Sequence, residues 1–178
     1  SPDMTDEVID RITDVMLETP LDGIVATNGS HNREGLKTSR TTLEKIGSGR
    51  LSGAPLTRRA VEIVRRIHTR SGGTYPIIGV GGLMSADDVR AMLDAGADLV
   101  QLYTGYIYEG PGLVRDVCRA LIADTERVAE ELGAMRAAEE SMKNEKIPET
   151  SGPKPAETAG EASDGKPEEK RHPGSEAK

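Results

Sequence analysis

The sequence predicts an α/β fold in which helices cover a parallel sheet. Three short apolar runs, "DGIVATN", "YPIIGVGG" and "ADLVQLYTG", alternate with segments that carry apolar residues at helical spacing. Continuous apolar runs are typical of parallel strands that are buried on both faces. The predicted order begins and ends with a helix and alternates throughout, which fits either a doubly wound sheet or part of an eightfold α/β barrel.

Capping residues and apolar periodicity predict four helices. Asp6 and Glu7 suit the first turn of a helix, because the positive end of the helix dipole favours carboxylates. The four helices are expected to begin after Thr5, at Pro55, after Ser85 and at Pro111. Between the first strand and the second helix, residues 29–53 read as a polar, glycine-containing loop.

Composition excludes several classes of function. The 178 residues include 23 Lys and Arg against 30 Asp and Glu, a net charge of −7, which argues against a nucleic-acid surface. Cys118 is the only cysteine, so a disulfide framework and a cysteine-based metal site are excluded and a reducing compartment is expected. No apolar run reaches the roughly 18 residues that a membrane-spanning helix needs.

Composition also divides the chain into two parts. Residues 1–142 carry the predicted strands and helices, whereas residues 143–178 hold one large aliphatic residue, Ile147, among abundant Pro, Gly, Glu and Lys. Such a segment buries too little apolar surface to offset its ordering entropy, so we expect a disordered tail over 143–178.

Three strands are too few to complete either predicted architecture. A three-stranded parallel sheet would leave open edges, and the chain opens on "SPDMT" with no strand ahead of its first predicted helix. We therefore expect residues 1–142 to be part of a larger domain.

Glycines gather at the end of the second predicted strand, at Gly79, Gly81 and Gly82. In α/β barrels the carboxyl ends of the strands build the active site, and phosphate groups bind backbone N–H groups in the loops after the last two strands. Glycine allows a phosphate to approach those groups, so "GVGG" is predicted to be a backbone cradle. A tight strand-to-helix turn without a ligand is the alternative.

Five strings together carry a family resemblance: "DGIVATN", "LSGAPL", "EIVRRI", "PIIGVGG" and "AGADLVQLYTGYIYEGP". In this order and spacing, over nearly all of residues 1–130, the chain resembles the C-terminal part of the quinone-linked, class 2 dihydroorotate dehydrogenases. The resemblance implies the last three βα units of a (β/α)8 TIM barrel. It also implies bound FMN and the oxidation of dihydroorotate to orotate in pyrimidine biosynthesis, with quinone as electron acceptor.

The resemblance assigns roles to individual positions. It implies FMN contacts at Thr27, Gly53, Gly82, Tyr103 and Thr104, and substrate contacts at Asn28 and Gly29. A carboxamide at Asn28 suits orotate, whose ring presents both donors and acceptors. The quinone path would pass Tyr106, Ile107 and Pro111.

Two positions depart from the family pattern. The family usually has Thr or Ser directly after the substrate-binding asparagine, where this chain has Gly29, and a second glycine ahead of "LSG", where this chain has Arg50. The first departure puts one substrate hydrogen bond in doubt. The second could stiffen the neighbouring loop or bring a cation close to the flavin.

The resemblance places the catalytic serine base and a flavin-contacting lysine on segments outside this sequence. It therefore implies no catalytic residue and no metal site in this chain, and no activity without the missing N-terminal half of the barrel. For the full-length family it implies a peripheral position on the cytoplasmic side of the membrane, with this chain alone expected to be soluble.

Two other functions stay open at this point. A non-redox barrel of the sugar-phosphate isomerase or lyase class would use the same phosphate cradle, although the "TN" after the first strand and the string "QLYTGYIYEGP" argue against it. A non-catalytic truncated product, whose tail carries the function, is the second.

Overall fold

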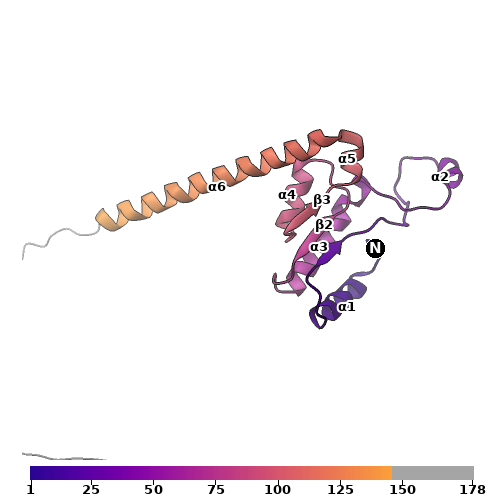
Figure 1. The fold of residues 1–178 in the computed structure, drawn as a ribbon, viewed down its shortest axis with the longest axis horizontal. Coiled ribbons are helices and arrows are strands. Elements are labelled where there is room, and N and C mark those ends of the chain that lie inside the picture. Colours follow the sequence, from indigo (N-terminus) through magenta and orange to yellow (C-terminus); the bar gives the residue numbers. More distant parts are fainter. Residues whose placement is uncertain (146–178) are drawn as a thin grey trace, which may run out of the picture. The chain divides into compact units, whose positions relative to one another are not determined.

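The computed structural model describes residues 1–145 and confirms an α/β fold around a parallel sheet (Figure 1). Its elements are α1 Asp6–Leu17, β1 Ile24–Ala26, α2 Arg40–Ile46, the 3-10 helix η1 Ala54–Leu56, α3 Thr57–Arg70, β2 Ile77–Val80, α4 Ala86–Asp94, β3 Leu99–Gln101, α5 Thr104–Glu109 and α6 Pro111–Glu145. The chain divides into two units, Ser1–Arg136 and Ala137–Lys178. The sheet and the core belong to the first unit, and the described part of the second, residues 137–145, is helical.

The sheet has the strand order β1-β2-β3, and both pairings are parallel. Val25 pairs with Ile78, and Ile78 pairs with Leu99. Because parallel strands point the same way, all three carboxyl ends meet at one edge of the sheet. The residues after the three strands are thereby brought together.

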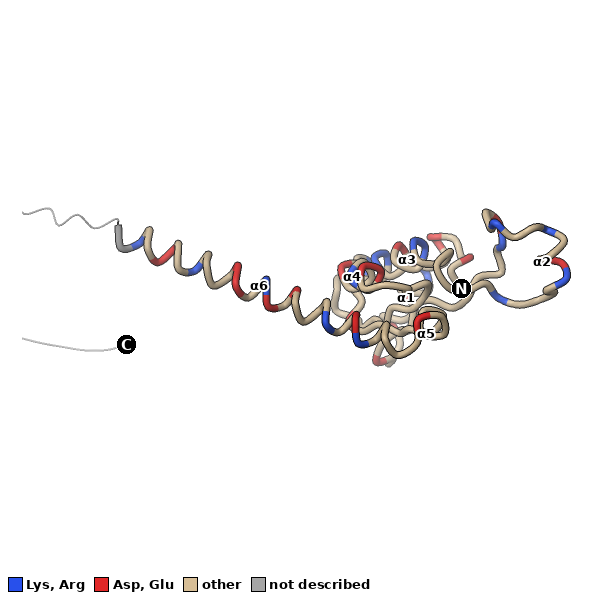
Figure 2. Tube along the Cα trace, turned by 90° about the horizontal axis from the view of Figure 1, so that it is seen from above, with Lys and Arg blue, Asp and Glu red and all other residues tan. Residues whose placement is uncertain are grey.

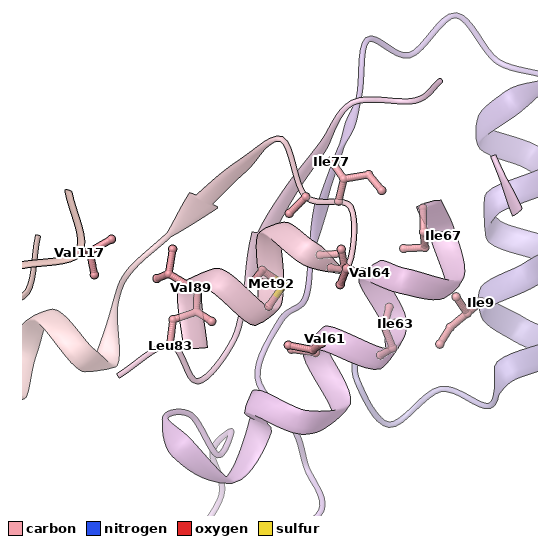
Figure 3. Packing of buried hydrophobic residues seen from close by; sticks show 14 of the residues in the cluster. Ile9, Val61, Ile63, Val64, Ile67, Ile77, Leu83, Val89, Met92 and Val117 are labelled. Atoms are coloured by element: carbon pink, nitrogen blue, oxygen red, sulfur yellow. The ribbon is translucent and has the colours of Figure 1, made fainter. Parts of the chain in front are cut away.

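Helices α3 and α4 cover one face of the sheet, where α3 contacts β1 and β2 and α4 contacts β3. Figure 3 shows side chains of these helices meeting Ile77 of β2, and Val64, Val89 and Met92 are fully buried there. A Cβ atom at Gly79 of β2 would lie 2.4 Å from Met92 Cγ. The lack of a side chain at Gly79 therefore lets α4 pack closely on the sheet.

Salt bridges join α1 to α3 along their length. On α1, Asp6, Asp10 and Asp14 are spaced four residues apart, so they lie on one face of the helix. Their partners on α3 are Arg59 and Arg66 for Asp6, Arg66 and Arg70 for Asp10, and Arg70 for Asp14. Arg59, Arg66 and Arg70 therefore hold α1 against α3.

Two short helices were not predicted from the sequence. Ser39 caps α2 by accepting the N–H of Thr42 at 3.3 Å, and none of its seven residues is buried. Figure 1 shows α2 within the long loop, away from the sheet. The third predicted strand ends at Gln101, and Thr104–Glu109 is helical instead, so Thr104 lies in the first turn of α5.

The fourth predicted helix begins at Pro111, as expected, and continues to Glu145. Helix α6 thus includes residues 143–145 of the predicted tail, and residues 146–178 of that tail lie outside the described residues. Figure 2 shows acidic and basic residues following one another along α6. Among residues 1–145, no helix is both long enough and apolar enough to cross a membrane.

Candidate functional site

A cavity of about 480 Å³ lies at the carboxyl ends of the three strands. Each strand and the loop that follows it contribute to the wall, as does the segment that leads into η1. All seven residues predicted to bind a ligand line it: Thr27, Asn28, Gly29, Gly53, Gly82, Tyr103 and Thr104. The cavity is thus the place where residues as far apart in the sequence as Thr27 and Thr104 meet.

Beside β1, Thr27 is tied to the neighbouring strand. Its backbone N–H and its hydroxyl both donate to the carbonyl of Val80, at 2.6 and 3.3 Å. Asn28 follows as an exposed residue, and its Oδ1 accepts the N–H of Gly29 at 2.7 Å. With this oxygen engaged, the carboxamide offers chiefly its two N–H donors to a ligand.

The loop after Asn28 is held by the N-terminal segment. The Ser30 hydroxyl donates to one carboxylate oxygen of Asp3, and the His31 N–H donates to the other at 2.7 Å. These two hydrogen bonds lower the pKa of Asp3 below its ordinary value of 3.8, and the bond from Ser30 has the larger effect. Asp3 therefore stays a carboxylate near neutral pH and keeps accepting both bonds.

Beside β2, Gly82 meets the protein's own backbone. It has a φ of +75°, and a Cβ atom there would lie 2.6 Å from Thr57 N and 2.7 Å from Gly53 O. The Thr57 hydroxyl also donates to the Gly82 carbonyl at 2.6 Å. A side chain at Gly82 would therefore collide with the start of α3 and with the Gly53 carbonyl, inside the protein itself.

Beside β3, the Thr104 hydroxyl donates to the Ser52 hydroxyl at 3.0 Å and links α5 to the segment before η1. Sequence reasoning missed Ser52 and emphasised only the glycine of "LSGAPL". The available signal was the hydroxyl of Ser52, which directly precedes the predicted ligand-binding Gly53. Tyr103 leaves 73% of its surface exposed at the mouth of the cavity.

The side chains that line the cavity carry no ionisable acid or base other than the phenol of Tyr103. Among residues 1–145, no cluster of His, Cys, Asp or Glu could hold a metal ion. The backbone N–H groups of Gly53 and Gly82 donate to no other group within the described residues. An anion bound here would therefore rely on backbone and hydroxyl donors.

The three residues assigned to a quinone path do not line this cavity. Tyr106 and Ile107 lie on α5 and Pro111 begins α6. Tyr106 exposes 44% and Ile107 68% of its surface. All three are exposed or partly exposed and lie outside the lining of the cavity.

Comparisons with known proteins identify the relatives of this chain. The family model for dihydroorotate dehydrogenase matches residues 1–124. The dihydroorotate dehydrogenase (quinone) of Kineococcus radiotolerans is 46% identical over 127 residues, which are 71% of this chain and 35% of that protein. The corresponding protein of Thermosynechococcus vestitus is 49% identical over 129 residues, 69% of this chain and 35% of that protein.

Solved structures extend the likeness to the fold. The crystal structure of dihydroorotate dehydrogenase from Eimeria tenella in complex with ferulenol matches with a TM-score of 0.65 and 35% identity, covering 72% of this chain and 34% of that one. The three βα units seen here are thus part of a TIM barrel, and the chain spans about a third of the length of the curated relatives it matches. The chain belongs to the dihydroorotate dehydrogenase family.

Proposed function

We propose that this chain forms the FMN- and substrate-binding edge of an enzyme that oxidises dihydroorotate to orotate and passes the electrons to quinone. Because the chain spans about a third of its relatives, the whole activity is proposed for an assembly that also holds the remaining barrel units. The observation that carries the proposal is the convergence of all seven predicted binding residues on one cavity.

The cavity suits the phosphate end of FMN. Among the described residues the backbone N–H groups of Gly53 and Gly82 are unpaired donors, and the Thr104 hydroxyl becomes a further donor when it turns from Ser52 to the phosphate. No carboxylate among the lining residues would repel an anion. We propose that these groups hold FMN together with Thr27 and Tyr103. When bound, FMN supplies the acceptor for the two electrons and the hydrogen that leave the substrate.

Asn28 suits the substrate. Its engaged Oδ1 fixes the carboxamide so that the N–H donors serve a ligand, and dihydroorotate offers carbonyl and carboxylate oxygens as acceptors. We propose that Asn28 orients the substrate ring and that the neighbouring Gly29 lines the same subsite. We propose that the base that takes the substrate proton comes from barrel units that this chain does not span, which leaves the chain alone inactive.

Flavin titration of the full 178-residue chain tests the first half of the proposal. We expect quenching of flavin fluorescence, with Thr104→Ala weakening FMN by roughly tenfold through the loss of one hydrogen bond to a charged group. Asn28→Ala should keep FMN affinity and lose orotate binding. Thr125→Ala is the matched control, since within the described part of the chain the Thr125 hydroxyl donates only to the Leu121 carbonyl on α6.

Addition of the N-terminal barrel units of a relative as a separate polypeptide tests the second half. We expect dihydroorotate-dependent reduction of a quinone by the mixture and none by either polypeptide alone. Equal FMN affinity in wild type, Thr104→Ala and Thr125→Ala would contradict the site. Sugar-phosphate binding without flavin binding would favour an isomerase or lyase instead.

A further inference from the structure

Position 29 needs a glycine because there is no room for a side chain, and not because of its backbone conformation. Its φ is not among the positive values found at ten other glycines within residues 1–145. A Cβ atom at Gly29 would lie 2.9 Å from Arg50 Cβ, 2.9 Å from Leu51 O and 3.5 Å from Arg50 Cδ. The stem of Arg50 and the backbone of Leu51 therefore occupy the place of a side chain at position 29.

Arg50 also bonds the loop that it packs against. Its Nη1 donates to the Gly29 carbonyl at 3.1 Å. Beside this contact, the Ser30 N–H donates to Leu51 O at 3.0 Å and the Leu51 N–H donates to Ser30 O at 2.7 Å. Arg50 and Leu51 thus form one side of a clamp on residues 28–31.

Asp3 forms the other side of the clamp through Ser30 and His31. Asn28, between these anchors and β1, leads into the clamped loop and lines the cavity. Among residues 1–145, Arg50 forms no salt bridge, so its side chain is not held elsewhere by a carboxylate. The contacts of the Arg50 side chain are with the loop.

We propose that Arg50 is a positioning residue that fixes the Asn28–Gly29 backbone against the cavity, and that it requires glycine at position 29. The substrate part of this inference rests on the proposed function, because it takes Asn28 as the group that binds dihydroorotate or orotate. The contact between positions 29 and 50 is independent of that function. A larger residue at 29 would collide with the stem of Arg50 as well as with Leu51 O.

Amide hydrogen exchange in the full 178-residue chain tests the clamp. Arg50→Met removes the bond to Gly29, so we expect exchange at the Ser30 and Leu51 amides to rise roughly threefold to tenfold. Arg40→Met is the matched control, because Arg40 is 92% exposed and pairs only with Glu44 within α2. Unchanged exchange in Arg50→Met would overturn the proposal.

A double-mutant cycle tests the steric part. Gly29→Ala should open the Ser30–Leu51 bridge and speed exchange at both amides, and adding Arg50→Gly should recover part of the loss because one of the two close contacts is removed. The contact with Leu51 O remains, so recovery is expected to be incomplete. Purely additive effects of the two substitutions would overturn the steric pairing.

Ligand titration separates positioning from a general structural role. With FMN present, Arg50→Met should weaken orotate at least roughly threefold, as expected for a mispositioned hydrogen-bond donor, while FMN affinity stays at the wild-type value. Arg50→Lys keeps the charge but not the guanidinium fork. If it restores orotate affinity while loop exchange stays fast, charge and not positioning explains Arg50, and the proposal fails. If the wild-type chain binds neither FMN nor orotate, the proposed function fails in this chain, whereas the exchange data still decide the clamp.

Discussion

Gly82 combines two demands, a positive φ and a lack of room for a side chain. Its φ of +75° is a conformation that side chains disfavour, and its missing Cβ makes room for Thr57 N and Gly53 O. Gly72 has a similar φ of +64° but nothing within 4 Å. Comparing substitutions at Gly82 and Gly72 therefore separates the free-energy cost of the backbone conformation from that of steric collision.

Gly82→Ala should destabilise the fold more than Gly72→Ala. At Gly72 the cost is that of a left-handed alanine, about 1 kcal/mol. At Gly82 overlap with backbone atoms, which cannot rotate away, should add roughly 1–3 kcal/mol. Urea unfolding of the two variants measures the difference. Equal losses of unfolding free energy in the two variants would mean that the loop after β2 shifts freely. Loss of flavin binding by a Gly82 variant is informative only if urea unfolding shows that the variant is still folded.

At the scale of elements, the salt bridges between α1 and α3 make stability depend on pH. Hydrogen bonds from Arg66 and Arg70 hold the pKa of Asp10 and of Asp14 below the ordinary value of 3.8. A carboxyl whose pKa is lower in the folded state stabilises the protein above its unfolded pKa. That stabilisation is lost as the pH falls through the folded pKa.

Replacement of both carboxylates, Asp10→Asn with Asp14→Asn, should lower the melting temperature by a constant amount from pH 7 to about pH 5. Below pH 3.8 the gap between wild type and variant should close, because the wild-type carboxylates become protonated as well. Melting curves between pH 2 and 7 record this gap. Asp22→Asn is the control, since Asp22 forms no salt bridge among the described residues. A difference in melting temperature that persists at pH 2 would show that the asparagine side chains destabilise the protein by disturbing its packing, and not by removing charge.

Helix α6 contains an interior glycine with no structural need for it. Nothing lies within 4 Å of a Cβ added at Gly133. Gly133→Ala should favour the helical state by roughly 0.5–1 kcal/mol and slow amide exchange around position 133. The melting temperature of the sheet should not move, because residues 125–136 are exposed and take no part in the core. Ala134→Gly should have the opposite effect, and equal exchange in both variants would refute the argument.

At the scale of the whole molecule, the sheet has one covered and one open face. Val25, Ile78 and Leu99 are paired across the three strands on the face away from α3 and α4, and Val25 exposes 55% and Leu99 63% of its surface. Exposed apolar rows of this kind mark surfaces that bind another part of a protein. In a TIM barrel this face would be the one turned to the interior.

The open face should bind a hydrophobic dye such as bis-ANS. Val25→Ser with Leu99→Ser should lower the dye fluorescence, while Ile46→Ser, at a single exposed apolar residue of α2, should change it little. Addition of the remaining barrel units should lower the signal of the wild type as well. Dye binding that is unaffected by the two strand substitutions would place the apolar surface elsewhere.

Local sequence determined the three strands and the four long helices of this protein. A strand core or a helix cap depends on residues within a few positions of each other, as at Ser85, whose side chain accepts the N–H of Asp88 three residues later. The two missed helices are short, and "TGYIYEG" continues an apolar strand without interruption, so local signals could not separate α5 from β3. The site residues followed from the family pattern, and the parallel order of the strands brings them to one edge.

Only the tertiary structure decided why particular residues are needed. Gly82 meets Thr57 across 25 positions, Arg50 reaches Gly29 across 21, and Arg70 pairs with Asp14 across 56. Such contacts depend on how the helices pack on the sheet, and no signal confined to neighbouring residues contains that packing. The sequence alone could therefore name the glycines of the cavity, whereas the structure showed that two of them make room for the protein's own backbone and side chains.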